Sequence, residues 1–265
     1  MQNNTLITGI LTGTIIAIIA GTILLAVEYG LFDNDEPLVI IVPKSHEVPK
    51  EPAEKASTEA AGTDAPTPPQ TEAKPPLDFK ISYLHRPTGA DAFQRLTNSS
   101  VLQSRDYYKI IFTPLEDSHV YIFQRDSANK IYQLFPMKRF KDIELNNRNP
   151  VQGGETYYIP SQGKSFRLDE QTGTETIYFL ATRQRDTALE QQYQQIRAAQ
   201  RHDKAVQQEL TKAFIENLEQ KGLKDIKDDP ETHSWTTEGQ KFTVPQQRLE
   251  DLNQDSIHIL TFQHQ

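Results

Sequence analysis

The sequence predicts an α+β protein: an antiparallel β-sandwich-like domain with a long packed C-terminal helix, preceded by one transmembrane helix and a disordered, proline-rich linker. Three features of the 265 residues predict this. An uncharged apolar stretch opens the chain, nine prolines fall within 37–76, and short aromatic and β-branched segments follow from about residue 77. We therefore divide the chain into an anchor (1–36), a linker (37–76) and a globular domain (77–265).

Composition argues against two classes of site. The chain carries 28 Lys and Arg against 36 Asp and Glu, for a formal net charge of −8. Nucleic acid is therefore not expected as a partner, because binding phosphates requires a basic face. The chain has no cysteine, which excludes disulfides, thiolate nucleophiles and cysteine-type zinc sites.

The first element is a predicted membrane anchor at residues 6–27, which carry no charge. At ~1.5 Å per residue such a helix is about 33 Å long, enough for the ~30 Å hydrocarbon core of a bilayer. A cleaved signal peptide is the alternative, but it requires a basic start and a shorter apolar core. Residues 1–5 contain neither Lys nor Arg, so we favour an uncleaved helix that binds the lipid bilayer.

Few basic residues flank this helix to set its orientation. Acidic residues follow it, from Glu28 to Glu36, and Lys44 is the first basic residue. We favour a single-pass protein of the bacterial inner membrane with its C-terminal domain in the periplasm, because an anchor, a long linker and a domain in this order are typical of envelope proteins.

Small residues recur every four positions in the anchor, at Gly9, Gly13, Ala17 and Gly21. They form one stripe on a helix, and small residues allow two helices to approach closely. The stripe indicates a homodimer through the transmembrane helix. The alternative is that Gly and Ala are simply common in membrane helices.

The linker is expected to be disordered, since residues 44–74 contain almost no large apolar side chain to offset the entropy of ordering. Such a segment would hold the globular domain away from the bilayer.

The globular domain begins with segments that read as strands. They are rich in β-branched and aromatic residues and are separated by turn residues. Gly173 suits a positive φ before the last of them, and 120–124 has two apolar faces, which predicts a central strand. The expected strands are 79–84, 107–113, 120–124, 131–135, 156–159, 165–168 and 176–182.

A helical region near 187–221 follows, and Gly222 ends it. Thr187 and Glu190 fit a capping box, and a second apolar stripe at Val206, Leu210, Phe214 and Leu218 continues the pattern. The polar run 200–204 between the stripes indicates a kink or a stretch of helix that leaves the sheet. A last strand at 257–262 is expected to pair back into the sheet.

Motif analysis predicts no catalytic, cofactor-binding or metal-binding residues. The histidines lack metal-ligand spacing, and neither a nucleophile elbow nor a phosphate-binding loop occurs. One basic-aromatic segment, Lys138, Arg139, Phe140 and Lys141, is a candidate binding loop for an anionic polymer or lipid headgroup. An ordinary solvated loop is the alternative.

A series of short motifs resembles a known family. In order these are an aromatic strand at 120–123, Leu-Phe-Pro at 134–136, two glycines at 153–154, Tyr-Ile-Pro at 158–160 and Gly-Thr-Glu at 173–175. The stretch from about Tyr108 to Ala181 resembles an uncharacterised bacterial family, domain of unknown function 4384. The resemblance implies an accessory or sensory module, often in envelope proteins, and it carries over no catalytic residue.

These observations favour a non-catalytic, membrane-anchored accessory or sensory module of the cell envelope. It would bind another envelope protein or a cell-wall polymer such as peptidoglycan. The alternative is a carboxylate-dependent hydrolase of envelope material, with Glu116, Asp117 and Glu175 as the first acids to test, and such an enzyme requires two carboxylates within ~5–9.5 Å.

Overall fold

The computed structural model describes residues 75–200 and 202–265. The predicted anchor, its Gly9, Gly13, Ala17 and Gly21 stripe and nearly all of the predicted linker lie outside this part. In the part described, no helix has the length and apolar character needed to cross a bilayer.

One antiparallel sheet, here called sheet A, contains seven strands. Its main order is β10-β4-β1-β14-β13, with β2 paired to β1 and β9 paired to β4. Its strands are β1 (Leu77–Arg86), β2 (Gln94–Arg95), β4 (Tyr107–Pro114), β9 (Tyr157–Ile159), β10 (Phe166–Arg167), β13 (Ile226–Thr237) and β14 (Gln240–Leu252).

The second sheet, sheet B, has six strands in the order β12-β15-β11-β5-β6, and β3 pairs with β15. Only the short β12 and β3 run parallel to their neighbour β15 in the described chain. The strands of sheet B are β3 (Val101–Leu102), β5 (His119–Arg125), β6 (Ile131–Phe135), β11 (Gly173–Thr182), β12 (Gly222–Leu223) and β15 (Ser256–His264), and β7 (Met137–Phe140) and β8 (Ile143–Asn147) form a separate hairpin.

The two sheets pack face to face around the main core, so the predicted sandwich-like α+β fold is confirmed. Successive side chains of a strand point to opposite faces. Phe79 and Phe112 of sheet A therefore meet Phe179 of sheet B, with ring centroids 5.3 and 5.6 Å from that of Phe179. Gly173 adopts the expected positive φ, +139°, at the start of β11.

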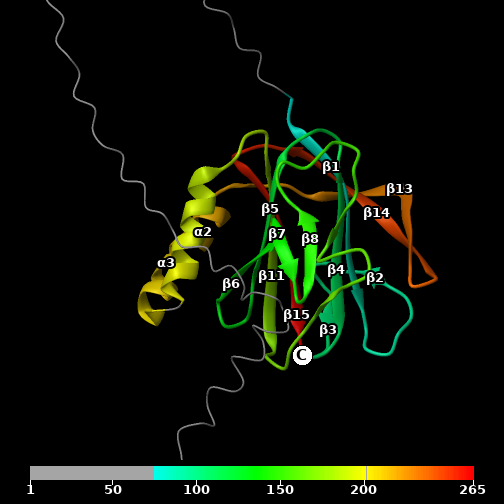
Figure 1. Cartoon of the computed structure of the whole chain (residues 1–265), viewed down its shortest axis with the longest axis horizontal. Coiled ribbons are helices and arrows are strands. Elements are labelled where there is room, and N and C mark those ends of the chain that lie inside the picture. Colours follow the sequence, from blue (N-terminus) through cyan, green and yellow to red (C-terminus); the bar gives the residue numbers. More distant parts are fainter. Residues whose placement is uncertain (1–74, 201) are drawn as a thin grey trace, which may run out of the picture. The chain divides into compact units, whose positions relative to one another are not determined.

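The alternate residues of sheet B face two helices, α2 (Thr187–Ala199) and α3 (Lys204–Glu219), which cover its outer face (Figure 1). Phe123 packs between Tyr193 and Phe214, with centroid distances of 5.3 and 5.0 Å. Strand β5 is thus buried on both faces and central, as its two apolar faces predicted.

The single long helix expected at 187–221 is wrong, because α2 ends at Ala199 and a separate helix, α3, begins at Lys204. Asp203 caps α3, its carboxylate accepting the N–H groups of Ala205 and Val206. The expected cap at Thr187 is also one residue late, since Asp186 accepts the Leu189 N–H at 2.9 Å. Val206, the first residue of the second apolar stripe, is 43% exposed.

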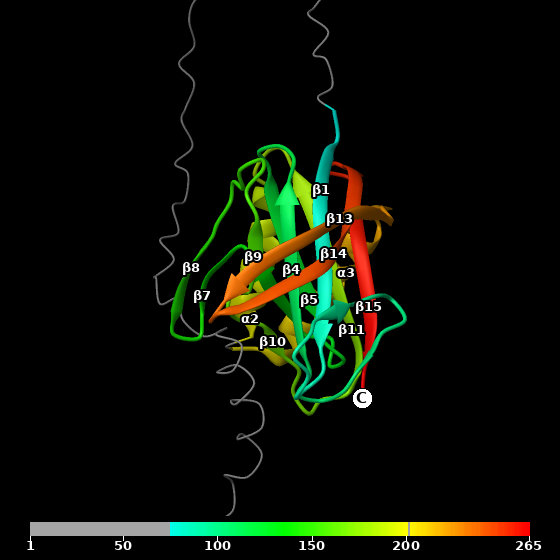
Figure 2. The same ribbon diagram turned by 90° about the vertical axis from the view of Figure 1, so that its right-hand side faces the viewer.

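A hairpin covers the outer face of sheet A. The register of β13 and β14 shifts between Asp228 and Thr232, and beyond it the hairpin crosses β1 and β4 towards β9 (Figure 2). We call residues 232–245 the arm. Its Trp235 and Phe242 stack with centroids 5.1 Å apart over Leu84 and Ile111. The described chain therefore has four layers: arm, sheet A, sheet B and helices.

Candidate functional site

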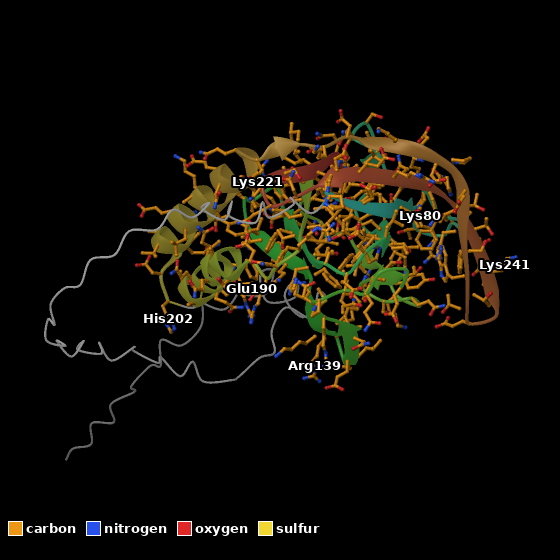
Figure 3. The ribbon with its side chains drawn as sticks, turned by 90° about the horizontal axis from the view of Figure 1, so that it is seen from above. Lys80, Arg139, Glu190, His202, Lys221 and Lys241 are labelled. Atoms are coloured by element: carbon orange, nitrogen blue, oxygen red, sulfur yellow. The ribbon has the colours of Figure 1, made fainter. Side chains whose placement is uncertain are left out.

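The predicted basic-aromatic loop is a β-hairpin. Lys138, Arg139 and Lys141 are exposed on or beside β7, and Figure 3 shows Arg139 where this hairpin projects. Phe140 is buried, however, and its ring meets Phe166 edge-on at 5.4 Å. This ring therefore anchors the hairpin to the core, and of the predicted binding loop only the three basic side chains are exposed.

The three acids of the predicted hydrolase do not meet. The Glu116 carboxylate bonds Arg183 at 2.8 Å, and Asp117 accepts the Gly153 N–H at 2.8 Å. Glu175 lies near the opposite end of the β5–β11 pair, seven residues along β11 from Thr182, which pairs with His119, and therefore more than about 20 Å from Glu116 and Asp117. Glu175 therefore cannot act on the same bond as Glu116 or Asp117.

Glu175 instead lines a narrow pocket near the junction of β5, β6, β10 and β11. We call it the acid pocket, because its walls combine apolar side chains with three carboxyl groups. About 20 Å³ is open to the centre of a water molecule. The lining residues are Gln124, Asp126, Tyr132, Leu134, Met137, Phe166, Leu168, Asp169, Gln171 and Glu175.

A buried polar network lies beside the pocket. Gln124 Nε2 donates to Glu175 Oε2 at 2.7 Å, and the Tyr108 hydroxyl donates to Gln124 Oε1. On the other side His264 Nδ1 lies 3.9 Å from Glu175 Oε1, and its Nε2 is 3.2 Å from the Ser104 hydroxyl. Burial raises the pKa of Glu175, although His264 and Gln124 oppose this rise.

Ser104, His264 and Glu175 follow the order of a nucleophilic triad, but the donors for an oxyanion are missing at this serine. Acyl transfer requires free N–H groups aimed at the developing negative charge. The backbone N–H groups from Gln103 to Asp106 all donate within the protein. The arrangement therefore serves as a buried polar network. Burial lowers the pKa of His264, but Glu175 and Asp169 together raise it by more, so this pKa lies above its ordinary value.

Asp126 is the second buried acid of the pocket, and motif analysis missed it. Its oxygens accept the Lys130 N–H at 2.7 Å and the Tyr132 hydroxyl at 3.1 Å. Burial raises the pKa of Asp126, and these donors oppose the rise. Two carboxyls of raised pKa thus share one small pocket.

A larger and more open groove runs between β8 and β9. About 290 Å³ of it is open to the centre of a water molecule, and we call it the β8–β9 groove. Most of its lining is polar, with two tyrosines. The lining residues are Ile143, Glu144, Leu145, Asn146, Asn147, Glu155, Thr156, Tyr157, Tyr158, Ser161 and Gln162.

Contacts beneath the groove fix the two tyrosine rings. Tyr157 stacks on Phe112 with centroids 5.2 Å apart, and its hydroxyl accepts the Gln152 N–H at 2.9 Å. The Tyr158 hydroxyl lies 2.9 Å from His233 Nε2. Burial raises the pKa of both tyrosines. The groove therefore has a rigid aromatic base.

A buried lysine lies behind one end of this groove, under the arm. Lys109 is 2% exposed and donates to the carbonyl oxygens of Ser161 and Gln162. Its Nζ is 5.7 Å from the Tyr158 ring centroid and 6.0 Å from that of Trp235. Burial, assisted by the charge of Arg86, lowers the pKa of Lys109 to about 7.

Residues 75–200 and 202–265 contain no group of three His, Asp or Glu side chains placed to hold a metal ion. The candidate features in this part are the acid pocket, the β8–β9 groove and the buried Lys109.

Residues 101–185 match the family model described as "Domain of unknown function (DUF4384)". The resemblance is thereby confirmed for this segment. Every residue that lines the acid pocket and the β8–β9 groove lies within the DUF4384 segment, whereas the arm and both helices lie outside it. No match was found among curated proteins or among solved structures.

Proposed function

We propose that this chain is a non-catalytic accessory module of the bacterial cell envelope that binds a cell-wall polymer in the β8–β9 groove. In this proposal residues 6–27 anchor it in the inner membrane, and the linker presents the domain to the periplasm. The order of anchor, linker and domain in the sequence supports the placement, and the DUF4384 match is compatible with an accessory role.

The lining of the β8–β9 groove carries the proposal. Asn146 and Gln162 each offer amide donors and acceptors, and Glu144 and Glu155 offer acceptors, all on exposed side chains. Glycans present hydroxyl and amide groups on a ring whose faces are partly apolar. An open polar groove with fixed tyrosine rings suits such a ligand better than it suits an apolar one.

The hydrolase alternative is less well supported. The acids first singled out lie at opposite ends of a strand pair, and Ser104 lacks neighbouring N–H donors for an oxyanion. Binding without bond cleavage is therefore the function that the geometry favours.

Co-sedimentation with purified, insoluble peptidoglycan tests this proposal, using the full-length chain in detergent. We expect the wild-type chain to sediment with the polymer and Asn146→Ala/Gln162→Ala to lose at least tenfold in affinity. The matched control, Gln194→Ala/Gln208→Ala, removes two exposed amides from α2 and α3 and should bind like the wild type.

Absence of wild-type sedimentation, or equal loss in both double variants, would overturn the proposal. A photo-crosslinking residue at position 146 addresses the alternative partner. Crosslinks to an envelope protein in intact cells, with none to peptidoglycan, would replace the polymer by a protein.

A further inference from the structure

One side of the β8–β9 groove is a short turn that is held from outside the groove. Ser161 and Gln162 line the groove, and the Lys164 N–H closes the turn by donating to the Ser161 carbonyl oxygen at 3.3 Å. We call residues 161–164 the groove turn. From β4, the Lys109 amine donates to the carbonyl oxygens of both Ser161 and Gln162. The position of the groove turn therefore depends on an amine that is not part of the groove lining.

The arm closes over this amine. Lys109 is buried, and its Nζ lies 5.7 Å from the ring centroid of Tyr158 and 6.0 Å from that of Trp235, an arm residue. The arm also contacts the groove turn directly, because the Gln162 side-chain amide donates to the Thr236 carbonyl oxygen at 3.3 Å. Figure 2 shows β13 and β14 extending across β4 towards β9. The arm, the amine and the groove turn are thus connected to one another.

The amine is costly to bury, which distinguishes it from a packing residue. In the described chain no carboxylate pairs with Lys109, and the charge of Arg86 on the neighbouring β1 disfavours its protonated form. An apolar side chain would fill the same space without this cost, because desolvation of a charge is unfavourable. What Lys109 contributes instead is a pair of hydrogen bonds to the groove turn.

We propose that Lys109 is a positioning residue for the β8–β9 groove: its amine fixes the groove turn from behind, and the arm covers this contact. The role rests on the proposed function of the groove, and it adds a form of regulation to it. Opening of the arm or of the groove turn exposes the amine to water, so closure of this side of the groove is linked to the protonation of Lys109.

Deprotonation of the amine favours the closed arrangement. Burial, assisted by the charge of Arg86, lowers the pKa of Lys109 to about 7, whereas an exposed amine has the ordinary pKa of 10.5. Between these values the open form holds a proton that the closed form lacks, so closure becomes more favourable as the pH rises.

The other titratable and charged groups around the amine keep their charge states from pH 7.0 to 8.5. Arg86 stays charged, as arginine does throughout this range. Burial lowers the pKa of His233, whose Nε2 lies 2.9 Å from the Tyr158 hydroxyl, and burial raises the pKa of Tyr158. His233 is therefore neutral and Tyr158 protonated, which leaves Lys109 as the group that titrates.

Hydrogen exchange of the full-length chain in detergent, followed by mass spectrometry, tests this linkage. The Lys164 N–H donates within the groove turn, so its protection reports on closure. After correction for the intrinsic rate at each pH, wild-type protection should rise at least fivefold from pH 7.0 to 8.5, and Lys109→Met should show no rise. The control Lys212→Met, at an exposed position on α3, should keep the wild-type rise.

Co-sedimentation with peptidoglycan measures whether the position of the groove turn matters to the ligand. At pH 7.5 Lys109→Met should bind the polymer at least fivefold more weakly than the wild type, because the groove turn loses both hydrogen bonds. Lys212→Met should bind like the wild type. Circular dichroism verifies that the variants fold. If Lys109→Met does not fold, the wild-type exchange profile decides alone, since it needs no variant.

The two proposals can fail separately. Absence of a pH-dependent rise in wild-type protection, or an equal rise in all segments of the domain, would overturn the role of Lys109. A folded Lys109→Met that binds the polymer like the wild type would also overturn it, and would leave the proposed function in place. If the wild type does not bind peptidoglycan, the proposed function fails, while a rise confined to the groove turn and the arm would still show that Lys109 holds this side of the groove.

Discussion

Lys109 has no solvent around its amine, which instead contacts two carbonyl oxygens and two aromatic rings. Its folded-state pKa of about 7 lies below the ordinary value of 10.5. Between these two values the unfolded chain holds a proton that the folded chain lacks, so a rise in pH favours the folded state.

This gives a prediction for Lys109→Met. The wild-type free energy of unfolding should increase between pH 7.5 and 9.5 by at most about 1.4 kcal/mol per pH unit, and Lys109→Met should lose this increase. Urea unfolding followed by circular dichroism measures both slopes. Lys212→Met, at a largely exposed position, should keep the wild-type slope. A wild-type slope retained in Lys109→Met would contradict the assignment.

Gly173 allows a second prediction about a single residue. A Cβ at this position would lie 2.5 Å from the Ser127 Cβ, and the backbone φ of +139° disfavours any other residue. Gly173→Ala should therefore reduce the free energy of unfolding by about 1–3 kcal/mol. Adding Ser127→Gly should recover part of the loss, because it removes the clashing atom.

Gly222→Ala is the matched control for Gly173. Its added Cβ would lie 3.5 Å from the Asp255 carbonyl oxygen, an ordinary contact, and should change stability by less than about 0.5 kcal/mol. Equal effects at both glycines would refute the steric explanation.

Among the elements, the β7–β8 hairpin depends on one aromatic anchor. Phe140 is 2% exposed and packs on Phe166. Phe140→Ala should reduce the free energy of unfolding by about 3–5 kcal/mol, as for other buried aromatic truncations. The exposed neighbour Lys138→Ala should stay within about 0.5 kcal/mol. A small effect of Phe140→Ala in urea unfolding would show that the hairpin does not depend on this ring.

Among the longer strands that sequence analysis missed, β13 has an alternation that charge obscures. Strand β13 carries Lys227, Asp228, Asp229 and Glu231 around Pro230. Such residues are typical of an edge strand that must not pair further, and they conceal the strand pattern. Strand β8 was missed for a related reason, since only Leu145 and Asn147 of its five residues are buried.

At the scale of the whole molecule, the sandwich could be predicted from local pattern, but the sites could not. Runs such as 120–124 have two apolar faces because they lie between a second sheet and the helices. The β8–β9 groove is lined in part by β8, a strand that its sequence pattern does not reveal. The acid pocket is lined in part by Asp126, which lies between the expected strands 120–124 and 131–135. The sequence analysis singled out Glu175, but it combined this residue with Glu116 and Asp117, which the strand register places more than about 20 Å away.

The family match covers only part of the described fold. Residues 101–185 supply both concave features, but β1, β14 and β15 from outside that segment complete the two sheets. The segment that contains both concave features is thus combined with flanking elements that supply much of the packing.

Trp235 is the one tryptophan of the 265 residues, and it lies on the side of the arm that packs on sheet A, at 5% exposure. Its emission spectrum therefore reports on that layer alone, without any added label. Lifting of the arm from sheet A would shift the emission to longer wavelength while the far-ultraviolet signal of the sandwich stayed constant. The chain thus contains its own optical probe for separating local opening from global unfolding.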